Sequence, residues 1–288
     1  MYKIKIFLTS ALVIFILQGF AQRSSSSPFS RFGYGLISDK SLSFGQGLSN
    51  TGIGLRPGNH LNFVNPASFS AIDSSHFIFE VGVKNQFTTI EEGNNSATTS
   101  NSNMEYLAVG FPVARWWGMG FSLMPFSKVG YSFKTSSYLS DSTLISSYYE
   151  GMGGSNQLIC ANAISPIKGL TLGLNYAILF GTTTLESYNI IETDYVVENA
   201  WIQRSVNMKV FYLEGGFQYE HLLKDNKTLT VGAIFSPSQK LTSRNNLIVS
   251  TYTVEKTEGN KIKSDYPMKI GIGLSYSKKD KFMTGIDY

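Results

Sequence analysis

Cysteine and charge are both scarce in this chain of 288 residues. Cys160 is the single cysteine, so the chain can form neither an intramolecular disulfide nor a zinc site built on paired thiolates. Charged residues make up only 15% of the sequence, whereas soluble domains carry about 25%. The formal net charge is +4, and two of the positive charges, Lys3 and Lys5, lie close to the N-terminus. The composition excludes a highly charged tail protein and predicts no nucleic-acid partner.

Long hydrophobic runs are absent after the first 21 residues. Within those residues, two lysines precede an apolar run from Ile6 to Leu17, and small residues stand just before Gln22. This arrangement is typical of a secretory signal peptide and predicts that residues 1–21 are removed. A membrane anchor would need about 20 apolar residues, more than this run supplies. Because residue 22 is not cysteine, we do not expect a lipid-anchored lipoprotein, and the mature protein leaves the cytoplasm.

Apolar and polar residues alternate along most of the remaining chain. After Gly169 one face collects Leu170, Leu172, Leu174, Tyr176, Ile178 and Phe180, while the other carries mostly small or polar residues. The same period of two recurs from Met268 to Tyr276. The predicted strands are about 10 residues or longer, whereas strands of soluble sheets average about 5 to 6. The sequence therefore predicts an all-β fold, in which residues 76–288 form a transmembrane antiparallel β-barrel of the bacterial outer membrane. A secreted β-sandwich is the alternative.

The spacing of the connections also favours a barrel. Short turn-like links alternate with longer polar stretches, as expected for tight periplasmic turns and long outer loops. The longer stretches are residues 91–103, 134–143, 192–203 and 238–265. The pattern gives nine strands, although bacterial single-chain barrels have an even number. We therefore expect a barrel truncated before closure; the alternative is a complete barrel, with the strands miscounted by one and Tyr288 in a C-terminal assembly signal.

Two other segments depart from simple alternation. Residues 22–75 are rich in glycine and serine but also in aromatic residues, which predicts a plug packed in the barrel lumen; we call this segment the hatch. Gly215 and Gly216 interrupt a later strand whose apolar face changes phase, which predicts a kink or β-bulge in the barrel wall.

Two motifs resemble those of a known family. Leu48-Ser49-Asn50-Thr51-Gly52-Ile53-Gly54, followed by Asn62-Phe63-Val64-Asn65-Pro66-Ala67-Ser68-Phe69, resembles the N-terminal hatch of FadL-type outer-membrane fatty acid transporters. The segment from Tyr266 to Tyr288 is similar to a late hairpin of that family. Barrel subunits of the type IX secretion system belong to the same superfamily. The resemblance implies a 14-stranded barrel plugged by a hatch, although Arg56 to His60 stand where the family typically presents an acidic residue.

The resemblance implies a function in transport. Hydrophobic or amphipathic small molecules, fatty-acid-like in character, would pass the hatch and leave sideways into outer-membrane lipid. The hatch or gating residues would then be Asn65, Pro66, Ala67, Gly52 and Gly54. The alternative function is a docking or type IX secretion-associated barrel that handles protein cargo, with a secretion-system protein as its partner.

Signs of catalysis are weak in this sequence. His60, His76 and His221 are far apart, and none lies in a recognisable nucleophile motif. Ligands for a metal are not clustered either. We therefore expect no enzyme activity, no metal and no cofactor. Glu80, Lys84 and Lys269 are predicted to face the barrel lumen as polar lining.

Overall fold

The computed structural model describes residues 27–138, 143–192, 201–250, 254–257, 259–278 and 281–288. The predicted signal peptide, residues 1–21, lies outside the described residues. The N-terminal helical turns are η2 (Pro28–Arg31), α2 (Ser43–Gln46) and η3 (Pro66–Ala71). Among the described residues, no helix has the length and apolar character that a membrane span requires.

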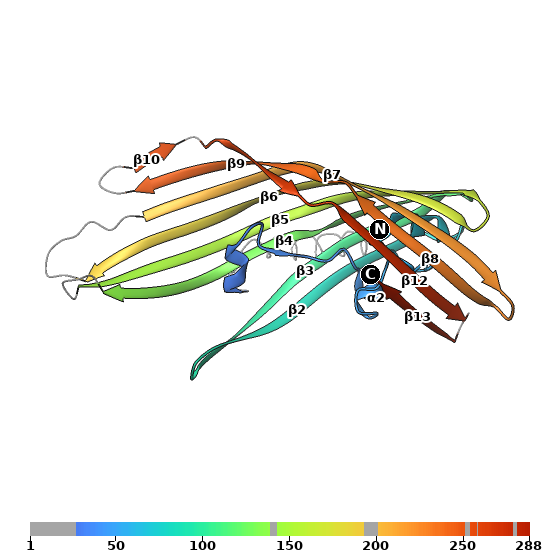
Figure 1. The fold of residues 1–288 in the computed structure, drawn as a ribbon, viewed down its shortest axis with the longest axis horizontal. Helices are drawn as coiled ribbons and strands as arrows, with labels where there is room; N and C mark the ends of the chain where they lie inside the picture. The colour runs from blue at the N-terminus through green and yellow to red at the C-terminus, as the bar shows by residue number, and fades with distance from the viewer. Residues whose placement is uncertain (1–26, 139–142, 193–200, 251–253, 258, 279–280) are drawn as a thin grey trace, which may run out of the picture.

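The described residues form one antiparallel sheet of 13 strands (Figure 1). These are β1 (Leu36–Ile37), β2 (Ile78–Glu92), β3 (Asn95–Ala114), β4 (Trp117–Tyr138), β5 (Leu144–Ile167), β6 (Leu170–Glu192), β7 (Trp201–Leu223), β8 (Lys227–Ser236), β9 (Gln239–Ser250), β10 (Val254–Thr257), β11 (Lys261–Tyr266), β12 (Lys269–Lys278) and β13 (Phe282–Asp287). The main order is β13-β12-β8-β7-β6-β5-β4-β3-β2. The prediction of an all-β antiparallel fold is confirmed, and the sheet is a curved wall that is not closed.

Proline divides two of the long wall strands. β9 pairs with the first part of β7 and β8 pairs with its last part, and Pro237 lies between β8 and β9. In the same way β11 pairs with β9, β12 pairs with β8, and Pro267 lies between β11 and β12. A proline lacks the N–H that a ladder needs. The polar stretch 238–265, predicted as a loop, instead contains β9, β10 and β11. The prediction missed these strands because their residues are mostly polar and show little alternation.

The two faces of the wall differ in polarity as the alternation predicts. On β6, Leu172 and Leu174 are 45% and 48% exposed on the convex face, whereas Thr171 and Asn175 are fully buried on the concave face. Side chains alternate between the faces of a strand, so each strand carries both surfaces. The apolar side chains on the convex face therefore lie outside the core.

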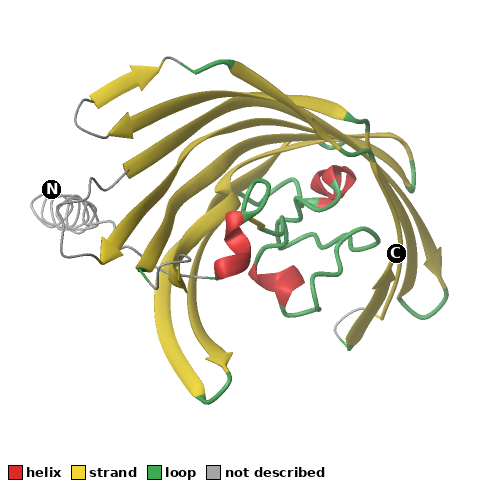
Figure 2. Cartoon of the chain, turned by 60° about the vertical axis from the view of Figure 1, so that its left-hand side comes forward, coloured by secondary structure: helices red, strands yellow, loops and turns green. Residues whose placement is uncertain are grey.

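The core lies between the concave face and the hatch. Figure 2 shows the short helices and loops of the hatch inside the curve of the sheet. Phe63 and Phe69 of the hatch pack edge to face, with ring centroids 4.8 Å apart, and both are buried. They belong to one buried cluster with small wall residues such as Ala161 and Ala163. The hatch and the wall thus both provide large side chains to the core, Phe126 and Tyr212 among those of the wall, and the wall also provides small residues.

Candidate functional site

A belt of small residues on the wall receives η3. Gly118, Ala163, Gly173 and Gly216 are direct cross-strand partners on β4, β5, β6 and β7. A β-carbon on any of the three glycines would collide with the hatch, whose backbone or side chains fill that space. We call these four residues the glycine seat. The absence of side chains here lets the hatch backbone approach the wall directly.

Asn65, Pro66 and Ala67 are the predicted hatch residues that lie on this seat, and all three are buried. The Asn65 side chain accepts a hydrogen bond from Ala67 N at 3.1 Å and so caps η3. Its amide nitrogen donates to the carbonyl of Ile53 at 2.8 Å and to that of Phe217 at 3.1 Å. Asn65 therefore joins two parts of the hatch to β7.

Gly52 and Gly54, also predicted as hatch residues, contact the other end of the sheet. The N–H groups of Gly52 and Ile53 both donate to Asp287 Oδ2, at 2.7 and 2.9 Å. Gly54 lies against the backbone of β12, and its carbonyl accepts from Ser275 Oγ at 2.7 Å. The hatch is thus bound both to the middle of the described wall and to its β12–β13 end, with Asp287 supplying a contact that sequence reasoning missed.

Gly215 and Gly216 lie in regular ladders, because the register of β7 with β6 passes through both residues without a shift, and the ladder of β7 with β8 begins at Gly215. The sequence pattern changes phase here because Met208 and Tyr212 are apolar residues on the inner face, where they are buried. The irregularity in this wall lies next to them, where β7 changes partner from β8 to β9. There the Gln239 side chain accepts from Leu213 N at 2.9 Å and donates to Leu213 O at 3.0 Å, as a backbone partner would.

A buried charged network joins the hatch to β7. Lys40 Nζ lies 2.9 Å from Glu214 Oε1, and Glu214 is 1% exposed. Tyr212 OH donates to Glu214 Oε2 at 2.9 Å, and Asn175 Nδ2 donates to Oε1 at 3.3 Å. Burial lowers the pKa of the Lys40 ammonium, and Glu214 opposes that shift. Sequence reasoning missed this network. The signal that could have revealed it was Glu214, an acidic residue at an inward-facing position of β7.

The predicted lumen residues lie in different places. Glu80 accepts a hydrogen bond from Leu61 N at 2.9 Å and so binds the hatch. Lys269 lines a cavity of about 270 Å³ together with Lys40 and Tyr212. Lys84 lies in a second, larger cavity.

That larger cavity is a lateral cleft between the β2–β3 hairpin and β4. The register of β2 and β3 shifts at Gly82 and Val83, which leaves Glu105 as the extra residue of a β-bulge. The ladder between β3 and β4 ends at Leu107 and Leu123, and beyond this point the two strands diverge (Figure 1). The wall therefore splits here, and we call the opening the lateral cleft.

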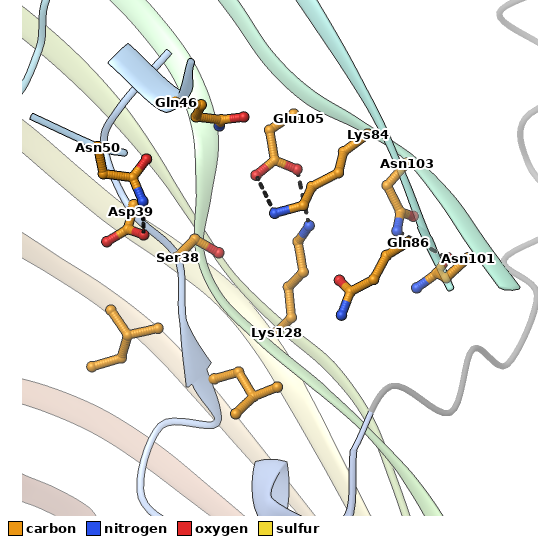
Figure 3. Close-up of a pocket in the computed structure, with 12 residues that line it drawn as sticks. Ser38, Asp39, Gln46, Asn50, Lys84, Gln86, Asn101, Asn103, Glu105 and Lys128 are labelled. Carbon is orange, nitrogen blue, oxygen red and sulfur yellow. Dashed lines mark hydrogen bonds and ion pairs between the residues drawn. The ribbon is translucent and has the colours of Figure 1, made fainter. Parts of the chain in front are cut away.

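Polar side chains line the lateral cleft. Figure 3 shows Glu105 between two lysines, with Lys128 Nζ at 3.3 Å and Lys84 Nζ at 3.9 Å from its carboxylate oxygens. The cavity has a volume of about 310 Å³. Its other polar lining residues are Ser38, Asp39, Gln46, Asn50, Gln86, Asn101 and Asn103. Amide side chains both donate and accept hydrogen bonds, so the cleft suits a partner with the same capacity, such as a peptide backbone.

Metal ligands are not gathered in the described part of the chain, where no group of three or more His, Cys, Asp or Glu residues is placed to hold an ion.

Comparison with known families identifies the chain. The family model named BamG matches residues 3–288. The chain belongs to the BamG family. No curated protein and no solved structure matches this BamG-family chain. The family, together with the all-β fold, indicates an outer-membrane β-barrel protein.

The BamG match corrects several interpretations. The assignment to the FadL-type superfamily, including its type IX secretion members, is wrong. The functions and partners inferred from it, transport of a hydrophobic ligand and docking to a secretion-system protein, are overturned with it. The motif was misleading because Asn65, Pro66 and Ala67 satisfy the geometry of a capped helix on a glycine seat, which does not specify a ligand.

Proposed function

We propose that this BamG-family chain acts in outer-membrane protein assembly, as a subunit of the BAM complex. The observation that carries the proposal is the match of the BamG family model over residues 3–288. A subunit of such a complex works by binding other proteins, so its functional surfaces are expected at exposed strand edges and polar clefts.

The filled interior supports a binding role. Tyr266 of β11 contacts both Phe126 of β4 and Tyr212 of β7 on the concave side, with ring centroids 5.9 and 5.5 Å apart. The hatch is hydrogen-bonded to wall strands at Asn65, Gly52 and Lys40. These contacts favour a hatch that stays in place as a structural part of the protein.

We also propose that the wall crosses the outer membrane as several strands and that the protein catalyses no reaction. The apolar convex face, exemplified by Leu172 and Leu174, supports the spanning role, because lipid-facing residues of barrels alternate with inward ones. The absence of catalysis is supported by the histidines, because His60 and His76 lie in different surroundings and do not form one catalytic group. His60 stacks on Phe44, while His76 lies beside Asp73.

The test is to purify the tagged full-length chain from native outer membranes in mild detergent. We expect the BAM complex to co-purify with the chain. We also expect depletion of the chain to lower the amounts of other outer-membrane β-barrel proteins, measured by quantitative mass spectrometry of outer-membrane fractions.

The control is an unrelated outer-membrane protein carrying the same tag and expressed at the same level. Recovery of the BAM complex with both proteins to the same extent would contradict the proposal. So would depletion that leaves the outer-membrane protein composition unchanged.

A further inference from the structure

We propose that the lateral cleft binds an extended segment of a partner polypeptide, which adds as a strand to the edge of β3 between Ser96 and Glu105. The inference rests on the proposed function, because the partner is a subunit or a client protein of the assembly machinery. It assigns the binding of that partner to a defined edge and cavity.

The first argument is the edge itself. β3 pairs with β2 from Asn95 to Gly110, but it pairs with β4 only from Leu107 to Ala114. In the described structure no ladder joins the stretch from Ser96 to Glu105 to β4. Such an edge is a template for strand addition. At about 3.3 Å per residue, it offers roughly 30 Å of backbone.

The second argument is that the opposite side of the same cleft already holds an added strand. β1 pairs with β4 through Leu36 with Lys128 and Ile37 with Ser127. Ser38 N donates to Phe126 O at 2.9 Å, which extends this pairing. The hatch therefore pairs with β4 at Ser127 and Lys128, on the side of the cleft opposite to β3. Because β4, on one side of the cleft, already pairs with the extended chain of β1, the cleft has room for an extended segment.

The third argument is the polarity of the β2–β3 hairpin. Beyond Lys84 and Asn103 its cleft-facing side carries residues such as Gln86 and Asn101. Its other face is also mostly polar: Ser100 and Ser102 both donate to Asn85 Oδ1 there. A lipid-facing strand would be apolar on one face. This hairpin is suited to water and to a polar partner, and its register is weakly fixed by burial.

The fourth argument is the side-chain link across the cleft. Lys128 of β4 donates to Glu105 of β3 at 3.3 Å, and Lys84 adds to the same carboxylate from β2. No backbone ladder reinforces this link in the described residues. A partner strand can therefore enter beside β3 without breaking the sheet, in a space that polar amide side chains line.

The test uses photo-crosslinking in the full-length protein in its native membrane. Asn101→p-benzoylphenylalanine and Asn103→p-benzoylphenylalanine place the probe on the cleft side. Ser100→p-benzoylphenylalanine and Ser102→p-benzoylphenylalanine place the same probe on the opposite face of the same strand and are the matched controls. Yields are normalised to the amount of assembled protein in the outer membrane.

We expect the cleft positions to crosslink to a co-purifying BAM subunit or client at least ten times more than the controls. Because side chains on one face of a strand are two residues apart, crosslinks from 101 and 103 should map to partner residues two positions apart. Bridging Glu105→Cys and Lys128→Cys with a short bismaleimide should abolish the crosslink, whereas Glu105→Cys alone with the reagent should not.

Several results would overturn the inference: equal yields on both faces, no crosslink from an assembled protein, or a product that contains only a second copy of this chain. Failure of the two proposals is distinguishable. If the BAM complex co-purifies but the cleft positions do not crosslink to it, the docking site is wrong and the proposed function stands. If nothing of the BAM complex co-purifies, the proposed function itself fails.

Discussion

At the scale of single residues, buried polar side chains fix the hatch to the wall. Asn65, Asn175, Gln218 and Glu214 are each at most 1% exposed. Each donates or accepts hydrogen bonds with the hatch; Gln218, for example, donates to Leu55 O at 2.9 Å. Buried polar groups are costly when they lose their partners. These residues therefore determine where the hatch lies, and apolar packing alone would determine it less sharply.

Replacing Lys40 tests this view. Lys40→Met leaves Glu214 buried without its cationic partner, and breaking such a pair costs about 3 kcal/mol. We expect a lower midpoint for heat-induced unfolding, measured by the mobility shift of the purified protein in gels. The double variant Lys40→Met with Glu214→Gln removes the orphaned charge and should recover part of the loss. Equal midpoints for the wild type and Lys40→Met would contradict the prediction.

Two adjacent glycines on β7 provide a second test. A side chain at Gly216 would collide with Asn65 and Pro66, whereas a β-carbon at Gly215 would lie 3.7 Å from Phe235 O, an ordinary contact. Gly216→Val should therefore destabilise the seated hatch by about 1–3 kcal/mol. Gly215→Val should leave it in place.

Limited proteolysis of the hatch measures the difference between the two valine variants. We expect cleavage at least ten times faster in Gly216→Val than in Gly215→Val. Similar cleavage rates would show that the glycine seat does not hold the hatch.

The sequence predicted some of these residues but not their partners. Asn65 and Pro66 could be singled out because a helix cap and its proline are adjacent in sequence. Lys40 and Glu214 could not be paired, because they are 174 positions apart and each looks like ordinary polar lining in its own segment. Contacts between distant segments leave no local pattern.

At the scale of elements, β1 compensates for the divergence of β3 from β4. This two-residue strand pairs with Lys128 and Ser127, where β4 has lost its β3 neighbour. The hatch therefore acts as part of the wall as well as filling its interior.

Interrupting this pairing should expose the edge of β4. Ser38→Pro removes the N–H that donates to Phe126 O, a bond worth about 1 kcal/mol. We expect hydrogen exchange to become about ten times faster in the β4 segment 126–130, measured by mass spectrometry. Ser38→Ala keeps the N–H and serves as the control. Unchanged exchange in Ser38→Pro would show that β1 does not protect this edge.

Strands could be predicted from the sequence where one face of the strand is apolar and the opposite face is polar or small. β6 and β12 follow the alternation that the sequence shows. β9 and β11 were missed because they are mostly polar, and the buried stretch of β9, Leu241 and Ser243, is too short to show a period of two. β1 was missed because its two residues pair with a strand about 90 positions away in the sequence. Nothing in the local sequence marks β1 as a strand; its pairing with β4 alone defines it.

At the scale of the whole molecule, the wall presents one apolar surface and one surface covered by the hatch. Spanning the membrane would place the apolar convex face in lipid. Leu174→Lys should then destabilise the inserted protein by about 2–4 kcal/mol if the residue lies near the bilayer midplane. Asn85→Lys, on the polar β2–β3 hairpin, is the control. We expect outer-membrane levels, measured by immunoblotting, to fall for Leu174→Lys alone; equal levels for both variants would contradict the spanning proposal.

The fold was more predictable than the function. Alternation along each strand follows directly from burial, so the all-β antiparallel architecture could be predicted from one sequence. A hatch on a glycine-lined wall is a packing solution that does not specify what the protein binds. For this reason the resemblance of the hatch motif led to the wrong family, while the all-β antiparallel fold was correctly predicted.

The contact of Asp287 with Gly52 constrains the order in which the protein can fold. The two residues are 235 positions apart, so the N-terminal hatch segment must wait for β13 before this bond can form. A polypeptide that enters the periplasm from its N-terminus exposes the aromatic residues of the hatch during that wait. Contacts between residues so distant in sequence form slowly, and until they form the exposed apolar surface can cause aggregation. The protein is therefore expected to depend on chaperones to keep its first segment soluble until its late strands arrive.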